Sequence, residues 1–152
     1  MSKPRWPTCG RNGSPVTVVV DASAIVEIAL DGDTPRRRAV LDVLRADPVW
    51  VVPEYTDIEV ISAVGRGVAR GSARGGLRSA EARDVLRLVA AMPFTRMDVC
   101  MVADRILELI DNHSASDAGY IAVAERVGAR VLTLDRGMAA SPVARCKFVQ
   151  LG

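Results

Sequence analysis

The chain has 152 residues, of which 49% are hydrophobic and 25% are charged, a composition typical of one soluble globular domain with a substantial core. The net charge of +2 is nearly balanced, so total charge neither requires nor excludes a nucleic-acid partner. No apolar run approaches the ~18 residues of a membrane span. The cysteines Cys9, Cys100 and Cys146 are widely spaced and odd in number, which excludes a disulfide framework and a zinc site and predicts a cytoplasmic protein.

The N-terminal half begins with a stretch unlike the rest of the chain. Residues 1–15 are rich in Pro, Gly and polar groups and predict a flexible extension, whereas residues 16–152 are expected to form the folded domain. Residues 16–20 are the most apolar run and predict a buried strand at the centre of a sheet. After it we expect a helix, a second helix, a strand and a third helix, over residues 22–30, 34–46, 49–52 and 54–70.

The C-terminal half continues the alternation of helices and strands. Apolar periodicity predicts three helices, over residues 79–92, 98–110 and 114–127. Ser114 is a candidate N-cap for the last of them, and Gly128 is a candidate left-handed C-cap. Two further strands are expected at 130–134 and 147–151. This alternation predicts an α/β fold with three layers and a mostly parallel central sheet.

Two aspartates directly follow predicted strands. Asp21 ends the first strand and Asp135 ends the strand at 130–134. Open parallel sheets bind ligands outside the carboxyl ends of their strands, so both side chains are expected at the mouth of the sheet. Each has a simpler alternative, because Asp21 can cap the following helix and Asp135 can belong to an ordinary turn.

Two more acids lie within helical patterns. Glu59 is surrounded by apolar residues, so its carboxylate needs a partner to offset the cost of burial. The partner is a metal ion or, if Glu59 faces the surface, Arg66. Asp117 begins the helix over 114–127 and can cap it, although Ser114 or Ser116 can do so instead and leave Asp117 free.

The four acids together indicate a cation site more strongly than any one of them does. Hard cations such as Mg²⁺ and Mn²⁺ prefer carboxylate oxygens, and clustered carboxylates repel one another without a cation. A divalent cation there would activate water and neutralise charge on phosphate oxygens. The acids therefore predict a Mg²⁺ or Mn²⁺ site that hydrolyses phosphodiester bonds.

Three segments match a known family over about residues 16–151: VVVDASAIVEIAL, PEYTDIEVISAVGR and SASDAGYIAVAERVGARVLTLDRGMA. They resemble the PIN-domain ribonucleases and, more narrowly, the VapC toxins of bacterial toxin–antitoxin pairs. The segment D-A-x-Y-x-A-x-A-E, followed by a strand that ends in T-L-D, is the most specific of these matches.

The resemblance implies a PIN-like three-layer fold and an endoribonuclease that depends on Mg²⁺ or Mn²⁺. It implies an acidic quartet that holds the metal, made of Asp21, Glu59, Asp117 and Asp135. It also implies that the hydroxyls of Ser23 and Thr133 lie near the metal and position water or the acids. The expected partners are an RNA substrate, a second copy in a homodimer, and a small VapB-type antitoxin through which the pair contacts DNA.

The stretch between Glu59 and Glu81 contains no acid. Its arginines recur at every fourth residue among glycines, at Arg66, Arg70, Arg74 and Arg78. Arginine suits phosphate, and glycine lets the backbone approach it closely. We therefore predict an RNA-contacting clip beside the metal site, with a mobile solvated loop as the alternative.

Other side chains have less specific interpretations. His113 is the only histidine and is expected in a surface loop, because metal-dependent hydrolysis needs no histidine base. Tyr120 is expected in the core. Apolar stripes that would serve a dimer, an antitoxin or the core itself contain Leu86, Leu88, Val89, Ile106 and Ile110.

Three other functions would also place an acid after the first strand or retain this fold. A haloacid-dehalogenase-type phosphatase needs a second Asp two residues after Asp21, where this chain has Ser23. A receiver domain needs a Lys after a late strand, but no Lys lies between Lys3 and Lys147. The remaining alternative is a non-catalytic PIN-like module that binds RNA or protein, against which the intact carboxylates argue.

Overall fold

The computed structural model describes residues 16–30, 32–71 and 76–152. The predicted N-terminal extension at 1–15 and Arg74 lie outside the described residues. Within them, no helix is both long and apolar enough to cross a membrane.

A parallel sheet of five strands, in the order β3-β2-β1-β4-β5, forms the centre of the fold. In chain order the strands are β1 (Thr17–Val20), β2 (Val49–Pro53), β3 (Thr95–Met97), β4 (Arg130–Thr133) and β5 (Phe148–Gln150). The apolar strand β1 is the middle strand, as predicted. Because neighbouring strands run in parallel, their carboxyl ends lie along one edge of the sheet.

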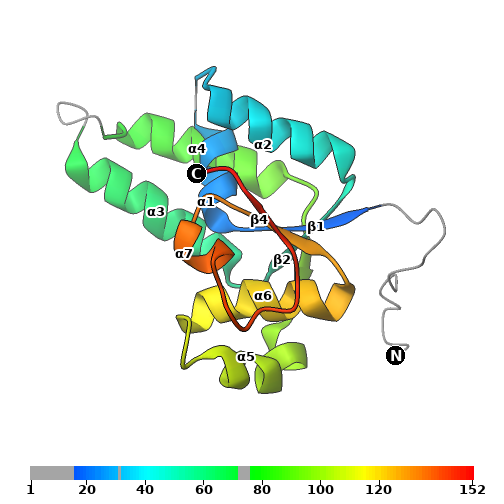
Figure 1. Cartoon of the computed structure of the whole chain (residues 1–152). Helices are drawn as coiled ribbons and strands as arrows, with labels where there is room; N and C mark the ends of the chain where they lie inside the picture. Colours follow the sequence, from blue (N-terminus) through cyan, green and yellow to red (C-terminus); the bar gives the residue numbers. More distant parts are fainter. Residues whose placement is uncertain (1–15, 31, 72–75) are drawn as a thin grey trace, which may run out of the picture.

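Helices cover both faces of the sheet (Figure 1). The longer ones are α1 (Ala22–Ala29), α2 (Pro35–Ala46), α3 (Thr56–Arg70), α4 (Ser79–Ala91) and α6 (Ala115–Val127), and the shorter ones are the 3₁₀ helix η2 (Val99–Val102), α5 (Ala103–Leu109) and α7 (Arg136–Ala139). Helices α1 to α4 pack on the face that carries Val18 and Val20. Helix α6, with η2, α5 and α7, packs on the face that carries Val19. The predicted three-layer α/β/α architecture is confirmed.

The strand β3 was not predicted. It is an edge strand of three residues, two of which have exposed side chains, so it presents no apolar run in the sequence. The helix predicted over 98–110 is divided between η2 and α5. Asp98 caps the amide of Cys100 and starts the 3₁₀ turn. The segment after Asp135, predicted as a turn, forms the short helix α7.

Helix α6 is buried almost all round, because it lies between the sheet and the layer of α5. Ser114 caps its N-terminus by accepting a hydrogen bond from the Asp117 amide. Gly128 ends it with a φ of 67°, the left-handed conformation that glycine adopts without steric cost. Both predicted caps are therefore present.

Candidate active site

Asp21 directly follows the central strand, and its amide donates to the Leu132 carbonyl at 3.0 Å. It is only 6% exposed. Its Oδ2 atom accepts hydrogen bonds from the hydroxyls of Ser23 and Thr133, the latter at 2.8 Å. Among the described residues, no hydrogen bond is made to its Oδ1 atom, which is left available for another ligand.

The two hydroxyls that hold Asp21 are themselves fixed by the backbone after β4. Ser23 Oγ accepts from the Leu134 amide at 3.1 Å, and Thr133 Oγ1 accepts from the Asp135 amide at 2.9 Å. Each hydroxyl thus accepts from the backbone and donates its proton to the carboxylate. The polar network sets the rotamer of Asp21 from the first turn of α1 and from the end of β4.

No cation compensates the charge of Asp21 within the described part of the chain. None of the ion pairs found there includes Asp21, Glu59 or Asp117. Burial raises the pKa of Asp21, and the nearby charges of Glu59 and Asp117 raise it further, while the hydrogen bonds from Ser23 and Thr133 lower it. The structure therefore brings these three predicted acids into one electrostatic neighbourhood.

Glu59 is half-buried on α3 and faces α6. Its Oε2 atom accepts a hydrogen bond of 2.6 Å from the hydroxyl of Tyr120. Among the described residues it forms no ion pair with Arg66, which was the alternative partner. Burial and the hydrogen bond to Glu59 both raise the pKa of Tyr120, so that hydroxyl keeps its proton and acts as a donor.

Tyr55 experiences the charges of all three acids, a feature that was not predicted from the sequence. Burial raises the pKa of Tyr55, and the negative charges of Glu59, Asp117 and Asp21 raise it further. Its hydroxyl donates to the carbonyl of Ser116. Its ring packs edge-on against that of Tyr120, with centroids 5.7 Å apart.

Asp117 is half-buried in the first turn of α6. Because Ser114 caps this helix, the Asp117 side chain is not needed for capping. Among the described residues it makes no hydrogen bond through its carboxylate.

Asp135 differs from the other three acids. It is exposed, and its Oδ1 atom accepts from the amides of Gly137 at 2.6 Å and Met138 at 3.2 Å, which makes it the N-cap of α7. It is not among the acids whose charge raises the pKa of Asp21. Its amide nevertheless bonds Thr133, so the backbone of Asp135 belongs to the network around Asp21.

Comparison with known proteins identifies the family of this chain. Residues 18–142 match the PIN domain family. The chain belongs to the PIN-domain family. Ribonuclease VapC12 of Mycobacterium tuberculosis is 32% identical over 124 residues, which cover 82% of this chain and 91% of that protein. Ribonuclease VapC9 of the same organism is 31% identical over 129 residues, or 85% of this chain and 94% of that protein.

Solved structures share the fold of this PIN domain. PAE2754 from Pyrobaculum aerophilum superposes with a TM-score of 0.60 at 20% identity. The match covers 95% of this chain and 92% of the PAE2754 chain. Mycobacterium tuberculosis VapC20, a toxin that cleaves the sarcin–ricin loop, superposes with a TM-score of 0.60 at 16% identity. The match covers 82% of this chain and 95% of the VapC20 chain. The sequence relatives make the chain a VapC-type PIN protein, and the structures support its three-layer fold.

The acids of this PIN domain suit a hydrated divalent cation. No three of the His, Cys, Asp and Glu side chains in the described ranges stand close enough together to hold an ion by direct contact. Mg²⁺ retains several waters and is usually bound through one or two carboxylates. Asp21 is buried, has no cationic partner within the described ranges and experiences the charges of Glu59 and Asp117, which matches that mode of binding.

The arginines predicted to contact RNA have different environments. Arg66 and Arg70 are exposed on α3, whereas Arg78 forms a capping box and an ion pair of 2.6 Å with Glu81. On a helix, positions seven and eleven residues after Glu59 fall on the same face as Glu59, about 10 Å and 16 Å along the axis. Arg66 and Arg70 therefore continue the face of α3 that carries the acid.

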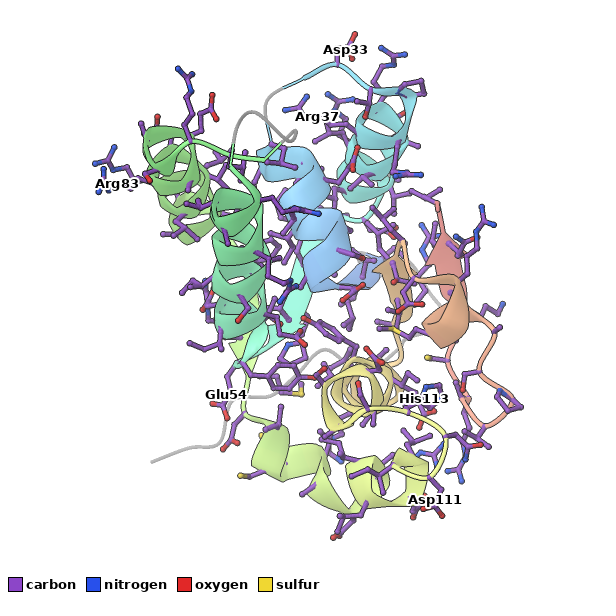
Figure 2. All side chains as sticks on the ribbon, turned by 90° about the vertical axis from the view of Figure 1, so that its left-hand side faces the viewer. Asp33, Arg37, Glu54, Arg83, Asp111 and His113 are labelled. Carbon is purple, nitrogen blue, oxygen red and sulfur yellow. The ribbon has the colours of Figure 1, made fainter. Side chains whose placement is uncertain are left out.

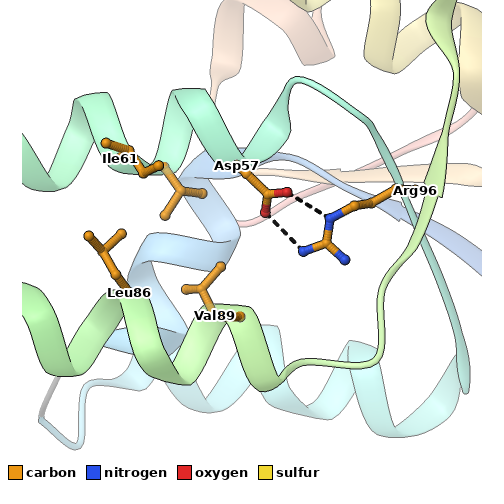
Figure 3. Close-up of a pocket in the computed structure, with 7 residues that line it drawn as sticks. Asp57, Ile61, Leu86, Val89 and Arg96 are labelled. Atoms are coloured by element: carbon orange, nitrogen blue, oxygen red, sulfur yellow. Dashed lines mark hydrogen bonds and ion pairs between the residues drawn. The ribbon is translucent and has the colours of Figure 1, made fainter.

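A separate pocket of about 350 Å³ opens between α3 and α4 (Figure 3). It is lined by apolar side chains and by an Asp57–Arg96 ion pair of 2.7 Å. Of the apolar stripe predicted on α4, Leu86 and Val89 line this pocket, while Leu88 is 47% exposed. The pocket lies on the α3–α4 side and contains none of the predicted acids.

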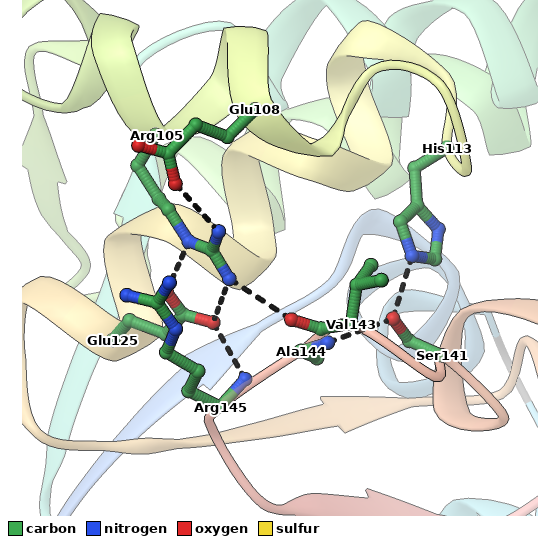
Figure 4. Close-up of polar contacts among 8 residues, drawn as sticks. All are labelled: Arg105, Glu108, His113, Glu125, Ser141, Val143, Ala144 and Arg145. Atoms are coloured by element: carbon green, nitrogen blue, oxygen red, sulfur yellow. Dashed lines mark hydrogen bonds and ion pairs between the residues drawn. The ribbon is translucent and has the colours of Figure 1, made fainter.

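A polar network ties the loop before β5 to the helical layer (Figure 4). Arg105 of α5 bonds Glu125 of α6 at 2.7 Å and the Val143 carbonyl at 2.9 Å. His113 lies in the loop between α5 and α6 (Figure 2), as predicted, and is half-buried against Ser141, with its Nε2 atom 2.6 Å from Oγ. These contacts hold the loop in place and engage the His113 ring with Ser141.

Proposed function

We propose that this VapC-type ribonuclease is an endoribonuclease that hydrolyses RNA with Mg²⁺ or Mn²⁺ at the pocket formed by Asp21, Glu59 and Asp117. The observation that carries the proposal is the carboxylate of Asp21, which is buried, has no cationic partner among the described residues and experiences the charges of Glu59 and Asp117. Such a charge is costly in the interior unless a cation compensates it. The bound cation would supply an activated water and neutralise charge on the scissile phosphate.

The residues of the pocket have distinct tasks in this proposal. Asp21 presents Oδ1 to the cation, because Oδ2 is occupied by the hydroxyls of Ser23 and Thr133. Glu59 presents Oε1, because Oε2 accepts from Tyr120. Asp117 adds the charge of a carboxylate that is not used for capping.

Asp135 remains the fourth acid of the proposal, although its Oδ1 atom caps α7. Its Oδ2 atom, to which no described residue donates, would be available to help hold a hydrated cation. In this role Asp135 would act from an exposed position, one that its amide bond to Thr133 ties to the network around Asp21.

RNA is proposed to lie along the face of α3 that leads away from the pocket. Arg66 and Arg70 supply exposed guanidinium groups on this face, and each can pair bidentately with a phosphate. Arg78 would have to leave Glu81 before it bound RNA, and Arg74 stays a sequence-based member of this set.

The direct test is cleavage of a mixed cellular RNA pool by purified protein with Mg²⁺, with Mn²⁺ and with EDTA. We expect cleavage with either metal and none with EDTA. Asp21→Asn should reduce it by more than the 10–100-fold typical for loss of a residue that only supports a ligand. The matched control is Asp47→Asn, another buried aspartate, which should cleave like the wild type.

Protein that is folded and loaded with metal but cuts nothing in a broad RNA pool would contradict the proposal. That result would favour a PIN-like module that binds RNA or protein without catalysis. Fragment ends from a positive result would identify the sequence that is cut.

The proposal includes a cytoplasmic location, a VapB-type antitoxin and a homodimer. The antitoxin follows from the VapC-type relatives, and contact with DNA would occur only through it. Exposed apolar side chains available for such partners include Ile61, Leu88 and Ile110. Light scattering of the protein alone, and with a co-expressed antitoxin, measures both assemblies.

A further inference from the structure

Two tyrosines bridge α3 and α6 beside the proposed metal-binding acids: Tyr55, the N-cap of α3, contacts α6, and Tyr120 of α6 contacts α3. On the basis of the proposed function, we propose that Tyr120 is a positioning residue that holds Glu59 in the orientation needed to bind the cation. Tyr55 supports the same arrangement from the opposite side. The tyrosines thereby fix the separation of Glu59 and Asp117 before the cation arrives.

The contacts of Tyr120 give its hydroxyl a definite direction. It is 1% exposed on α6 and donates to Glu59 Oε2 at 2.6 Å. The hydroxyl of Thr56, also 1% exposed, lies 3.0 Å from the Tyr120 oxygen. Since the phenol has one proton and gives it to Glu59, Thr56 is the donor in the second bond. The chain Thr56 to Tyr120 to Glu59 therefore orients the carboxylate from within the core.

Tyr55 makes the reciprocal contact. It precedes α3, and its hydroxyl donates to the carbonyl of Ser116, one residue before Asp117. Gly119 makes this approach possible, because a Cβ atom there would lie 2.1 Å from the Tyr55 hydroxyl. Glu59 is thus held by a side chain of α6, and the backbone next to Asp117 is held by a side chain at the start of α3.

Glu59 and Asp21 are held in the same manner. In each carboxylate one oxygen accepts from hydroxyls: the half-buried Ser23 and the buried Thr133 for Asp21, and the buried Tyr120 for Glu59. Such outer hydrogen bonds orient metal ligands, and their loss typically costs about 10–100-fold in metal affinity or activity. A tyrosine that served only the core would not need a carboxylate as its acceptor.

The test measures Mn²⁺ binding to the protein without RNA. The readout is the electron paramagnetic resonance signal of free Mn²⁺. Tyr120→Phe keeps the ring and removes only the hydroxyl. We expect it to weaken Mn²⁺ binding by about 10-fold or more. In a Glu59→Ala background, Tyr120→Phe should cause no further loss, because it acts through Glu59.

Two further variants keep the test decisive. Thr56→Val combined with Tyr120→Phe removes both buried hydroxyls with side chains of similar shape, which avoids leaving Thr56 without its partner. This double variant replaces Tyr120→Phe if the single variant unfolds, and the same loss of Mn²⁺ binding is expected. Tyr55→Phe tests the reciprocal contact and should weaken binding less, because its hydroxyl touches no carboxylate.

The outcomes separate this inference from the proposed function. A wild type that neither binds Mn²⁺ nor cleaves RNA overturns both. If the wild type does both and Tyr120→Phe binds Mn²⁺ equally well, the positioning role of Tyr120 alone is overturned. Equal losses with and without Glu59 would also overturn it, because they would assign Tyr120 a general structural role.

Discussion

Two buried aspartates, one at the amino ends and one at the carboxyl ends of the strands of the same sheet, have opposite electrostatic surroundings. Asp47 precedes β2, its side chain is 2% exposed, and it pairs with Arg130 at the start of β4, with Oδ2 2.6 Å from Nη2. Asp21 follows β1, is 6% exposed, and has only hydroxyls and other acids around it in the described structure. At the amino ends of the strands Arg130 supplies the cation, and at the carboxyl ends no described residue does so.

In this fold, a structural acid differs from a functional one in whether the protein itself compensates the buried charge. Asp47 is buried and the partly exposed Arg130 compensates its charge, so loss of Arg130 would leave an uncompensated charge in the interior. Asp21 gives no such benefit to the metal-free protein, because its burial and its neighbours disfavour the charged form. A side chain retained at a cost in stability is expected to serve binding or catalysis.

The largest effect expected from this comparison is a difference in sign between the same substitution at the two sites. Without metal, Asp47→Asn should lower the free energy of unfolding by about 2 kcal/mol, since it weakens a charged hydrogen bond to Arg130. Asp21→Asn should raise that free energy near neutral pH, because it removes a charge that burial disfavours. Urea titrations of both variants with EDTA measure the two differences.

The pH dependence of the same experiment follows from the raised pKa of Asp21. As the pH falls through this pKa, the wild-type carboxylate becomes protonated and its penalty disappears. The advantage of Asp21→Asn over the wild type should therefore shrink toward acid pH. Destabilisation by Asp21→Asn at neutral pH would contradict the claim that the charge of Asp21 lowers the stability of the metal-free protein.

A smaller effect is expected at Asp135, which has a structural role as the N-cap of α7 and a proposed role at the cation. Asn caps helices about as well as Asp, so Asp135→Asn should leave the melting temperature unchanged while it removes the charge. If Asp135 serves the cation through water, RNA cleavage should fall about 10-fold. Asp135→Ala is the companion variant, because it should also lose about 1 kcal/mol of stability with the cap. Wild-type cleavage by Asp135→Asn would restrict the site to Asp21, Glu59 and Asp117.

The smallest effect concerns the arginines beyond the pocket. Arg66→Gln with Arg70→Gln should weaken the binding of single-stranded RNA and lower the slope of log affinity against log salt by about 0.7 for each lost phosphate contact. Fluorescence anisotropy in an Asp21→Asn background measures binding without cleavage. Arg126→Gln is the control, because this exposed arginine lies in the last turn of α6. An unchanged salt slope would exclude this face of α3 from the RNA path.

The sequence predicted the fold well where hydrophobic pattern determines structure. The Val-rich run of β1, the caps of α6 at Ser114 and Gly128, and the parallel order of β/α units are local signals. The strand β3 gave no such signal, because its pairing with β2 is a tertiary contact and two of its side chains face solvent.

The candidate site was predictable in its acids and less so in their supports. Asp21 was predicted from its place after a buried strand, and Glu59 from its apolar surroundings. The roles of Tyr55 and Tyr120 depend on which side chains meet across α3 and α6, and the sequence does not give this information. One signal was present, since a buried tyrosine hydroxyl needs a partner and Tyr120 lies among small apolar residues.

The central claim is that the pocket of Asp21, Glu59 and Asp117 binds a divalent cation. The most direct measurement is anomalous diffraction from crystals grown with Mn²⁺, under conditions in which the protein cleaves RNA. The account predicts a peak within coordination distance of Asp21 Oδ1, on the side of Glu59 and Asp117, and none beside Asp47. The absence of a peak at Asp21, or a peak only at surface carboxylates, would contradict it.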